Sequence, residues 1–264
     1  MTPTVRYPFS VYESHMISPY RLISRAVRSG LYPVPVITRR YLRKVGQRHK
    51  YLMPGPQIGL DLGAGTSPFR RTMITYFELS SYKAVDIAPS ENTDLKADIC
   101  DLPIDDVSVS HVFALDVLQH IPDVQKAFVE IDRVLKPGGL LLISFPFMFG
   151  ECERVDYWRC SLEGMKRELT ARGYRILDAR KRGAVFFAFA SAIHLAIQLI
   201  IPGGRGPWRR EVSAWSVIRN AMILLLTIPT ATFGWACVGL DKLLPIPTLS
   251  GFYQGGFVLA RKGA

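Results

Sequence analysis

Short apolar runs alternate with helical patterns over the central part of this chain. Four of these runs have the length of buried strands: residues 58–62, 82–87, 107–117 and 140–145. Residues 124–135 repeat apolar positions at helical spacing, and Asp123 is suited to cap this helix, which Pro137-Gly138-Gly139 is predicted to end. Strands that alternate with helices predict an α/β fold with a parallel sheet.

A glycine-rich turn follows the first predicted strand, in the sequence IGLDLGAGTSPFR of residues 58–70. Gly63 and Gly65 allow a sharp turn and a close approach to a ligand. Asp61 would repel a pyrophosphate and attract a ligand that carries ammonium and sulfonium groups. The dinucleotide pattern GxGxxG is broken at Pro68. The turn therefore favours S-adenosylmethionine (SAM) over a dinucleotide, and an ordinary strand-to-helix turn is the alternative.

A second acid, Asp86, ends the next predicted strand 25 positions after Asp61. This separation is close to the roughly 20 residues at which a second-strand acid meets ribose hydroxyls in Rossmann-type folds. The alternative for Asp86 is a solvated turn residue. Asp98 ends a short strand-like segment, and Asp116 ends a longer, largely apolar strand.

The order DLGAGTSPFR, VDI, ADICDLP, DVLQHIPD and EIDRVLKPGG resembles the class I SAM-dependent methyltransferases, most closely their type 11 group. The resemblance covers about residues 58–178 and a last strand near 255–261. It implies a Rossmann-like sheet of seven strands whose final strand is antiparallel. It also implies that the methionine part of SAM is contacted by Asp61, Gly63, Ala64 and Gly65, and the ribose by Asp86 and Ile87. The adenine would be contacted by Asp98 and Ile99, and the methyl-transfer mouth would be lined by Asp116 and Val117.

Residues 156–174 resemble the DYxR segment of type 11 methyltransferases linked to glycan and cell-envelope biosynthesis. Ser161 is predicted to cap a helix with a buried stripe. Relatives often carry a histidine and a proline upstream, where this chain has GECERV. Asp156 and Arg159 are candidates for the substrate site or for a structural ion pair. His120 is the first candidate for a general base, with a structural role as its alternative.

Composition limits the other site chemistries. The four cysteines have no CxxC spacing and indicate neither a zinc site nor a disulfide framework, and no His/Asp/Glu cluster has metal-ligand spacing. We therefore expect no metal, and a reducing cytoplasm. Oligomeric state is not indicated by the sequence.

Positive charge is concentrated at the N-terminus. The net charge is +11, and residues 1–56 hold ten Lys or Arg against one acid, Glu13, a net +9. Two short basic amphipathic helices, separated at residues 32–35, are predicted there. They suit an anionic membrane surface. Nucleic acid is a weaker alternative because no NPPY-like motif is present, and we expect none as a partner; a solvated basic face is another.

Two apolar segments precede the last strand, at residues 184–201 and 221–240. Both approach the roughly 20 residues of a membrane span. Their flanks are basic on both sides, and Pro229 and Gly234 are predicted to interrupt the second segment, so helices lying in the membrane interface or a re-entrant pair are favoured. A helical cap over the active site or a dimer interface is the alternative, and His194 is interpreted as a packing residue.

Four regions follow from these patterns: a basic extension (1–56), a SAM-binding core (57–180), a hydrophobic helical insert (181–250) and the last strand (251–264). The predicted function is a SAM-dependent methyltransferase at the cytoplasmic face of the cell membrane, acting on a small-molecule or lipid-linked acceptor. A hydroxyl of a glycan, glycolipid or polyprenyl-linked intermediate is favoured. Methylation of a lipid quinone or isoprenoid, and an inactive membrane-associated scaffold, are the alternatives.

Overall fold

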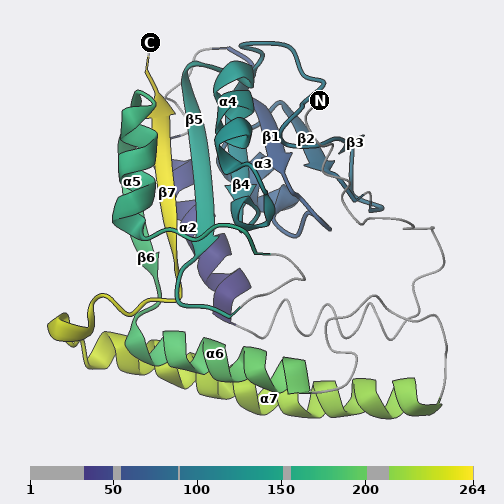
Figure 1. Ribbon diagram of the computed structural model, residues 1–264, viewed down its shortest axis with the longest axis vertical. Coiled ribbons are helices and arrows are strands. Elements are labelled where there is room, and N and C mark those ends of the chain that lie inside the picture. The colour runs from purple at the N-terminus through teal and green to yellow at the C-terminus, as the bar shows by residue number, and fades with distance from the viewer. Residues whose placement is uncertain (1–32, 50–54, 89, 151–155, 201–213, 264) are drawn as a thin grey trace, which may run out of the picture.

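The computed structural model describes residues 33–49, 55–88, 90–150, 156–200 and 214–263 (Figure 1). The first predicted basic helix lies outside the described residues. The elements are α2 (Pro33–His49), β1 (Ile58–Leu62), α3 (Arg70–Tyr76), β2 (Ser81–Asp86), β3 (Leu95–Lys96), β4 (Val109–Leu115), η1 (Leu118–His120), α4 (Val124–Val134), β5 (Leu135–Pro146), α5 (Leu162–Ala171), β6 (Tyr174–Arg182), α6 (Val185–Ile200), α7 (Ala214–Leu243), η2 (Pro247–Leu249) and β7 (Gly255–Lys262).

The seven strands form one sheet in the order β3-β2-β1-β4-β5-β7-β6. Strands β1 to β5 pair in parallel, and β7 lies antiparallel between β5 and β6. This arrangement confirms the predicted seven-stranded methyltransferase-like sheet. Because the parallel strands share a direction, their carboxyl ends meet at one edge, where ligands of open α/β sheets bind.

Helices cover both faces of the sheet, as Figure 1 shows. On one face, α4 and α5 bury the stripes predicted from their spacing, including Phe128, Ile131 and Met165. Asp123 and Ser161 cap these two helices, since each side chain accepts a backbone N–H bond. On the other face, α2 and α3 pack around Leu42 and Phe77. Local patterns therefore led to the correct buried faces of α4 and α5.

Helix α2 belongs to the basic extension but packs on the core. Tyr41, Leu42 and Val45 are buried, and the Tyr41 ring stacks on Phe257 of β7 with centroids 4.4 Å apart. The apolar side of α2 is therefore taken by the sheet and is not available to a bilayer. Its basic side is exposed, including Arg43 and Lys44.

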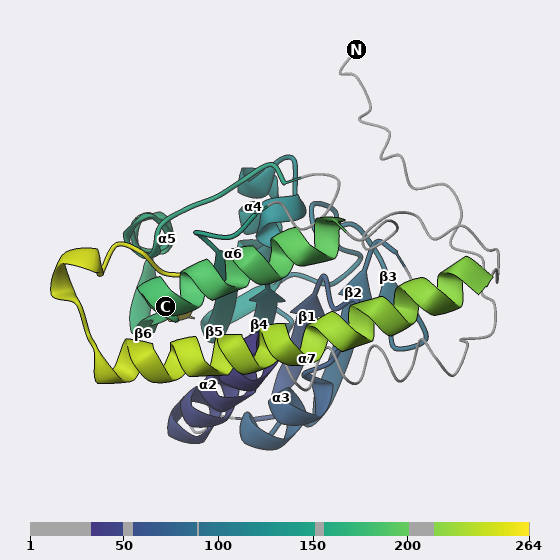
Figure 2. The same ribbon diagram turned by 90° about the horizontal axis from the view of Figure 1, so that it is seen from below.

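Helices α6 and α7 pack side by side beneath the carboxyl edge of the parallel strands (Figures 1 and 2). They run antiparallel, because the Asp241 carboxylate near the end of α7 accepts bonds from the N–H groups of Ala184, Phe186 and Phe187 at the start of α6. His194 bonds to Thr230 at 2.8 Å between the two helices, in agreement with a packing role. Among the described residues, no helix combines the length and hydropathy needed to cross a bilayer.

Two predicted breaks are wrong. Residues 137–139 do not end α4, which stops at Val134; they form an irregularity inside β5, where Leu135 pairs with Val109 and Leu140 with His111. A proline without an N–H suits such a bulge. Neither Pro229 nor Gly234 interrupts α7, which runs through both. An internal proline costs about 3 kcal/mol, and packing of α7 along α6 offsets this cost.

Candidate functional site

The glycine-rich turn lies at the carboxyl end of β1. Gly63 has φ +64, and a Cβ there would be 2.1 Å from Val117 Cγ2, so a side chain does not fit. Gly65 has φ +55, and a Cβ there would meet no atom within 4 Å. The turn therefore packs tightly against the end of β4 on one side, and beside Gly65 it leaves open space into which a ligand can approach the backbone.

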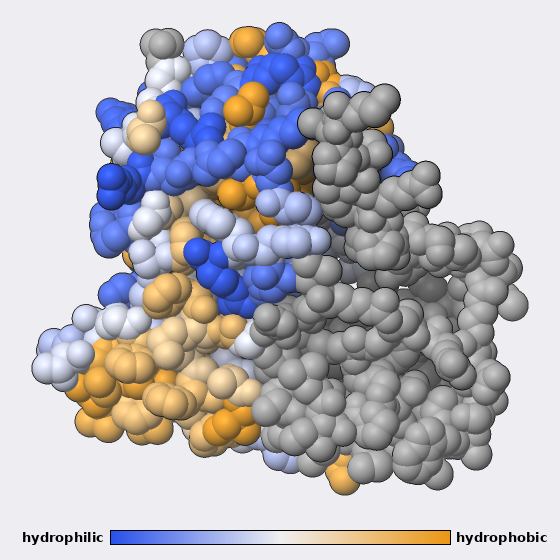
Figure 3. Space-filling view, in the orientation of Figure 1, coloured by the Kyte–Doolittle hydropathy of each residue, from blue (hydrophilic) through white to orange (hydrophobic). Residues whose placement is uncertain are grey.

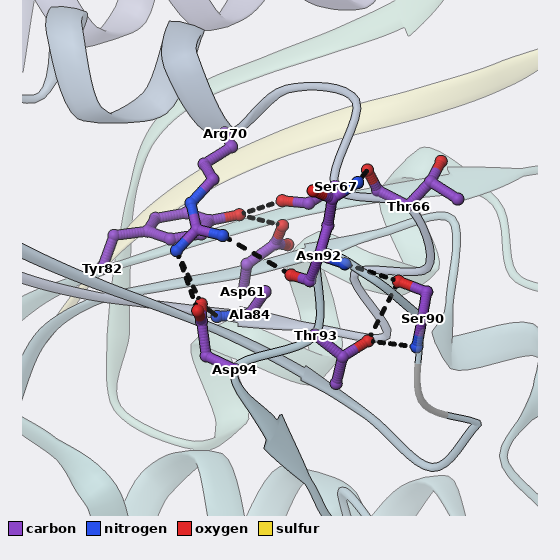
Figure 4. A network of polar contacts seen from close by, with 10 residues as sticks. All are labelled: Asp61, Thr66, Ser67, Arg70, Tyr82, Ala84, Ser90, Asn92, Thr93 and Asp94. Carbon is purple, nitrogen blue, oxygen red and sulfur yellow. Dashed lines mark hydrogen bonds and ion pairs between the residues drawn. The ribbon is translucent and has the colours of Figure 1, made fainter. Parts of the chain in front are cut away.

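The Asp61 side chain lies beneath this turn (Figure 4). Its carboxylate is 4% exposed and accepts a 2.5 Å bond from the Tyr82 hydroxyl, which is also 2.7 Å from Ser67 Oγ. Burial raises the pKa of Asp61 to about 7. The Asp61 carboxylate therefore lies in the protein interior beneath the turn. A direct contact between Asp61 and a cationic ligand stays a prediction.

The loop after β2 holds the turn from outside (Figure 4). Ser90 Oγ donates to the Gly65 carbonyl at 2.7 Å, and Asn92 Nδ2 donates to the Thr66 carbonyl at 3.1 Å. Arg70 binds both carboxylate oxygens of Asp94, at 3.0 and 2.8 Å. The backbone of the turn is thus held in place by side chains, and Ala64, which is buried, lies within it.

Asp86 ends β2 directly beside the turn. Its Oδ2 accepts a 2.8 Å bond from Gly65 N, and its Oδ1 accepts a 2.8 Å bond from Ala88 N. A carboxylate oxygen can accept two bonds, so each oxygen keeps one lone pair. Asp86 and Ile87 are partly exposed. This arrangement fits the predicted contact with a diol.

Asp98 and Ile99 come from the segment after β3. Asp98 is partly exposed, and its Oδ1 accepts a 2.8 Å bond from Cys100 N. The Ile99 side chain is buried in the core cluster of α4. An adenine contact from Ile99 would therefore use its backbone, while Asp98 retains a partly exposed carboxylate.

Asp116 stands at the carboxyl end of β4 with φ +51, a conformation that costs a non-glycine residue about 1–2 kcal/mol. Both oxygens of its carboxylate bind Arg182, at 2.7 and 2.9 Å. Arg182 is 2% exposed and also donates to the Gln254 side chain. This buried guanidinium therefore fixes Asp116 at the predicted methyl-transfer mouth. The next residue, Val117, packs on Gly63.

The three catalytic candidates, His120, Asp156 and Arg159, lie near one another because the backbone of Gln119 links their two segments. Tyr157 N donates to the Gln119 carbonyl at 2.7 Å, which places the Asp156–Arg159 segment beside η1, the element that ends in His120. His120 is partly exposed, and its Nε2 is 3.1 Å from Gln119 Nε2. His120 therefore keeps its role as the predicted base.

Asp156 and Arg159 form an ion pair. Arg159 also donates to the carbonyls of Phe149 at 2.9 Å and Phe147 at 3.3 Å. These bonds attach the segment after β5 to the loop before α5. The geometry favours the structural alternative for this pair, because the Asp156 side chain is only 3% exposed and both of its oxygens bind the guanidinium.

Sequence reasoning missed the two buried groups that support the acids. Arg182 was noted only as part of a basic flank, and Tyr82 as a strand residue. The available signal for Arg182 was weak: a basic residue at the end of a strand, directly before an apolar segment. Its partner is 66 positions away, and pairings of that range are not encoded in local spacing.

Residues 60–143 match the family described as "Methyltransferase domain". A malonyl-[acyl-carrier protein] O-methyltransferase of Methylococcus capsulatus is 30% identical over 193 residues, which are 61% of this chain and 67% of that relative. The chain belongs to the SAM-dependent methyltransferases. O-methyltransferase rstn1 of Aspergillus nomiae is 31% identical over 138 residues, which are 47% of this chain and 60% of that protein.

Solved structures share the fold of this methyltransferase. A SAM dependent methyltransferase from Archaeoglobus fulgidus superposes with a TM-score of 0.51 at 13% identity, over 93% of this chain and 100% of that one. Phosphoethanolamine N-methyltransferase 2 of Haemonchus contortus, in complex with phosphomonomethylethanolamine and S-adenosylhomocysteine, gives 0.50 at 16% identity, over 94% of this chain and 61% of that one. At these identities the likeness concerns the fold alone.

S-adenosylmethionine is the cofactor of this methyltransferase, and the described residues fit it. The open space beside Gly65 admits a ligand to the backbone of the turn. Asp86 offers two partly used carboxylate oxygens next to that space. Asp116 lies at the end of β4. It is across the turn from Asp86, because the next residue, Val117, packs on Gly63. The assignment of individual contacts remains a prediction.

Proposed function

We propose that this SAM-dependent methyltransferase O-methylates a lipid-linked acceptor, a glycolipid or polyprenyl-linked intermediate, at the cytoplasmic face of a membrane. The observation that carries this proposal is the exposed apolar surface of α6 and α7, which lie across the edge of the sheet that holds the site. A methyltransferase with a fully dissolved acceptor needs no such surface.

This surface, here called the α6–α7 face, is visible in Figure 3 as apolar side chains gathered over the two helices. Scattered exposed apolar residues are normal, but a contiguous group marks an interaction site. Among the side chains that the structure describes, the large exposed members on α6, on α7 and on the segment that follows are Phe189, Ile193, Leu225, Phe233, Leu240, Leu243, Leu244, Ile246 and Phe252. Their position beside the site favours a lipid-bound substrate.

One basic side chain of α2 lies against α7. The guanidinium of Arg40 on α2 lies 6.0 Å from the ring centroid of Trp235 on α7. Arg43, Lys44 and Arg48 of α2 are exposed. Apolar side chains beside positive charge are the combination that binds anionic lipid surfaces. This charge supports the cytoplasmic face of a membrane as the place of reaction.

The chemistry follows from the ends of β4 and η1. SAM supplies an activated methyl group, whose bond to sulfur breaks as the acceptor oxygen attacks and whose electron pair stays on sulfur, giving S-adenosylhomocysteine. We assign His120 to accept the proton of the acceptor hydroxyl. Asp116, fixed by Arg182, orients the acceptor. The two relatives named as O-methyltransferases support an oxygen acceptor.

Vesicle binding tests the proposal. Leu243, 77% exposed on α7, is changed to Asp, and Val129, 58% exposed on α4, receives the same change as the matched control. We expect wild type and Val129→Asp to sediment with phosphatidylglycerol vesicles and Leu243→Asp to bind at least tenfold more weakly. Methyl transfer from radiolabelled SAM to a lipid extract of membranes should fall in parallel.

Two outcomes would contradict the proposal. Equal vesicle binding by both variants would show that the α6–α7 face does not meet lipid. Transfer of label only into water-soluble acceptors would show that the substrate is not lipid-linked, while the assignment to the methyltransferase family would stand.

A further inference from the structure

A cavity of about 180 Å³ lies between the segment after β5 and helix α6. Its walls are Met148, Phe149 and Gly150 on one side and Ala188, Phe189 and Ala192 on the other. Among the described residues, none that lines it is charged. Ala188 and Ala192 are one helical turn apart, so two small side chains face the same opening. The cavity is therefore an apolar slot beside the helix, suited to a hydrocarbon.

Both walls are held by polar groups outside the cavity. Arg159 donates to the carbonyls of Phe149 at 2.9 Å and Gly150 at 3.3 Å, and its ion pair with Asp156 fixes the guanidinium. The start of α6 is held by Asp241, which accepts three backbone bonds. The slot is thus formed before any ligand binds, which lowers the entropic cost of binding.

The slot lies between the α6–α7 face and the segment after β5, which is bonded to residues that hold Asp116. Phe189 is 57% exposed and Met148 is also exposed, so the outer rim opens on the apolar surface. At the inner side, Phe147 N donates to the Gln254 carbonyl at 2.9 Å, and the Gln254 side chain binds Arg182, the partner of Asp116. The inner wall of the slot therefore directly follows Phe147, which is linked through Gln254 and Arg182 to Asp116.

We propose that this slot binds the hydrocarbon segment of the acceptor next to its polar head. The inference rests on the proposed lipid-linked acceptor and adds the place where its hydrocarbon part binds. Drug-sized ligands occupy about 300–1,000 Å³, so the slot accommodates only a short part of a chain. The rest of the chain stays in the bilayer or against the α6–α7 face.

The test uses defined probes. Binding of cis-parinaric acid, a fluorescent acyl chain, is measured by titration, and octyl, decyl and dodecyl glucosides compete below their micelle concentrations. Each buried methylene contributes about fourfold in affinity. We therefore expect competition to strengthen with chain length and then to level off when the slot is full.

Two variants of α6 separate filling of the slot from general hydrophobicity. Ala192 is exposed and lines the slot, whereas Ile193 is exposed on the same helix and does not line it. Ala192→Trp should weaken parinaric acid binding at least tenfold, and Ile193→Trp should leave it within twofold. S-adenosylhomocysteine affinity, measured by calorimetry, should be the same in both variants and wild type, which shows that they fold.

Three results would overturn the inference: equal loss in both variants, no dependence on chain length, or no probe binding by a wild type that binds S-adenosylhomocysteine. The last result would mean that part of this chain or a second copy fills the slot. These results are independent of vesicle binding. Chain binding without vesicle binding removes the membrane proposal alone, and vesicle binding without chain binding removes the slot alone.

Discussion

Asp116 shows how one residue combines strain, charge and position. Its φ of +51 is unfavourable for an aspartate, yet its backbone N–H donates to Ser144 at 2.9 Å and its carboxylate is held by both Nη atoms of Arg182. Strained backbone persists only where the surroundings fix it, and it gathers at functional sites. Arg182 is therefore a positioning residue for the mouth of the site.

Removing the Arg182 guanidinium should destabilise the fold and displace Asp116. We expect Arg182→Met to lower the free energy of unfolding by about 1–3 kcal/mol, since Asp116 stays partly hydrated while Gln254 loses its partner. The control is Arg180→Met, two positions earlier, whose pair with Asp178 is at the surface and worth about 0–1 kcal/mol. Urea unfolding measures both, and equal losses would refute a special role for Arg182.

Asp86 provides the most direct test of the cofactor contact. Asp86→Asn keeps an oxygen for Gly65 N but loses the charge and one acceptor. Hydrogen bonds to charged groups are worth about 1.5–3 kcal/mol, so S-adenosylhomocysteine should bind at least tenfold more weakly by calorimetry. Asp105→Asn, an exposed acid before β4, is the control. Unchanged affinity in Asp86→Asn would remove Asp86 from the cofactor site.

Asp61 should make stability depend on pH. Its pKa rises from 3.8 to about 7 on folding, so between these values the folded state binds a proton that the unfolded state has lost. Stability therefore falls as pH rises from about 4 to about 7, by up to about 4 kcal/mol. Urea unfolding should show this loss in wild type and not in Asp61→Asn. Parallel pH profiles would contradict the assignment.

At the scale of elements, local chemistry was predictable and distant partners were not. The spacing of apolar residues gave α4 and α5, and Asp123 and Ser161 were placed correctly as their caps. The turn after β1 was likewise predicted from glycines and an acid close in sequence. The breaks predicted at residues 137–139 and Pro229 were wrong because strand pairing and helix packing decide the structure there. Both kinds of contact involve segments far along the chain.

The capping of α6 is another long-range feature. Asp241 reaches the first N–H groups of α6 from α7, at separations of 54 to 57 positions. No rule for caps, which act within a few residues, finds such a partner. The insert before β7 is therefore a helical pair closed at one end by a carboxylate.

Loss of this cap should loosen α6. We expect Asp241→Ala to cost about 1–2 kcal/mol, as removal of a cap does, and to speed hydrogen exchange of the Ala184, Phe186 and Phe187 amides. Glu163→Ala provides the control, since this exposed acid pairs with Lys166 on the surface of α5. Unchanged exchange at these amides would show that packing alone holds α6.

In the whole molecule, an apolar surface on α6 and α7 and a basic surface on α2 are both exposed. The α6–α7 face covers the edge of the sheet with the site, and α2 packs on the core with its basic side exposed and Arg40 against Trp235. A membrane bound by this face would lie close to Arg40 beside Trp235. The site would then open toward the bilayer, from which a lipid-linked acceptor has to arrive.

Ionic strength should separate the two contributions to membrane binding. The Debye length falls from about 10 Å at 0.1 M salt to about 3 Å at 1 M, so salt screens the charges of α2 and leaves burial of the α6–α7 face unaffected. Each basic residue near an anionic surface is worth about 1 kcal/mol. Charge reversal of Arg43 and Lys44 to Glu should therefore weaken binding to phosphatidylglycerol vesicles at low salt at least tenfold and abolish most of its salt dependence.

The same reversal of Lys166 and Arg167 on α5 should have little effect, because these residues lie on the helix layer opposite α2. Equal weakening by both pairs would indicate attraction by net charge alone and would remove α2 from the membrane-binding surface.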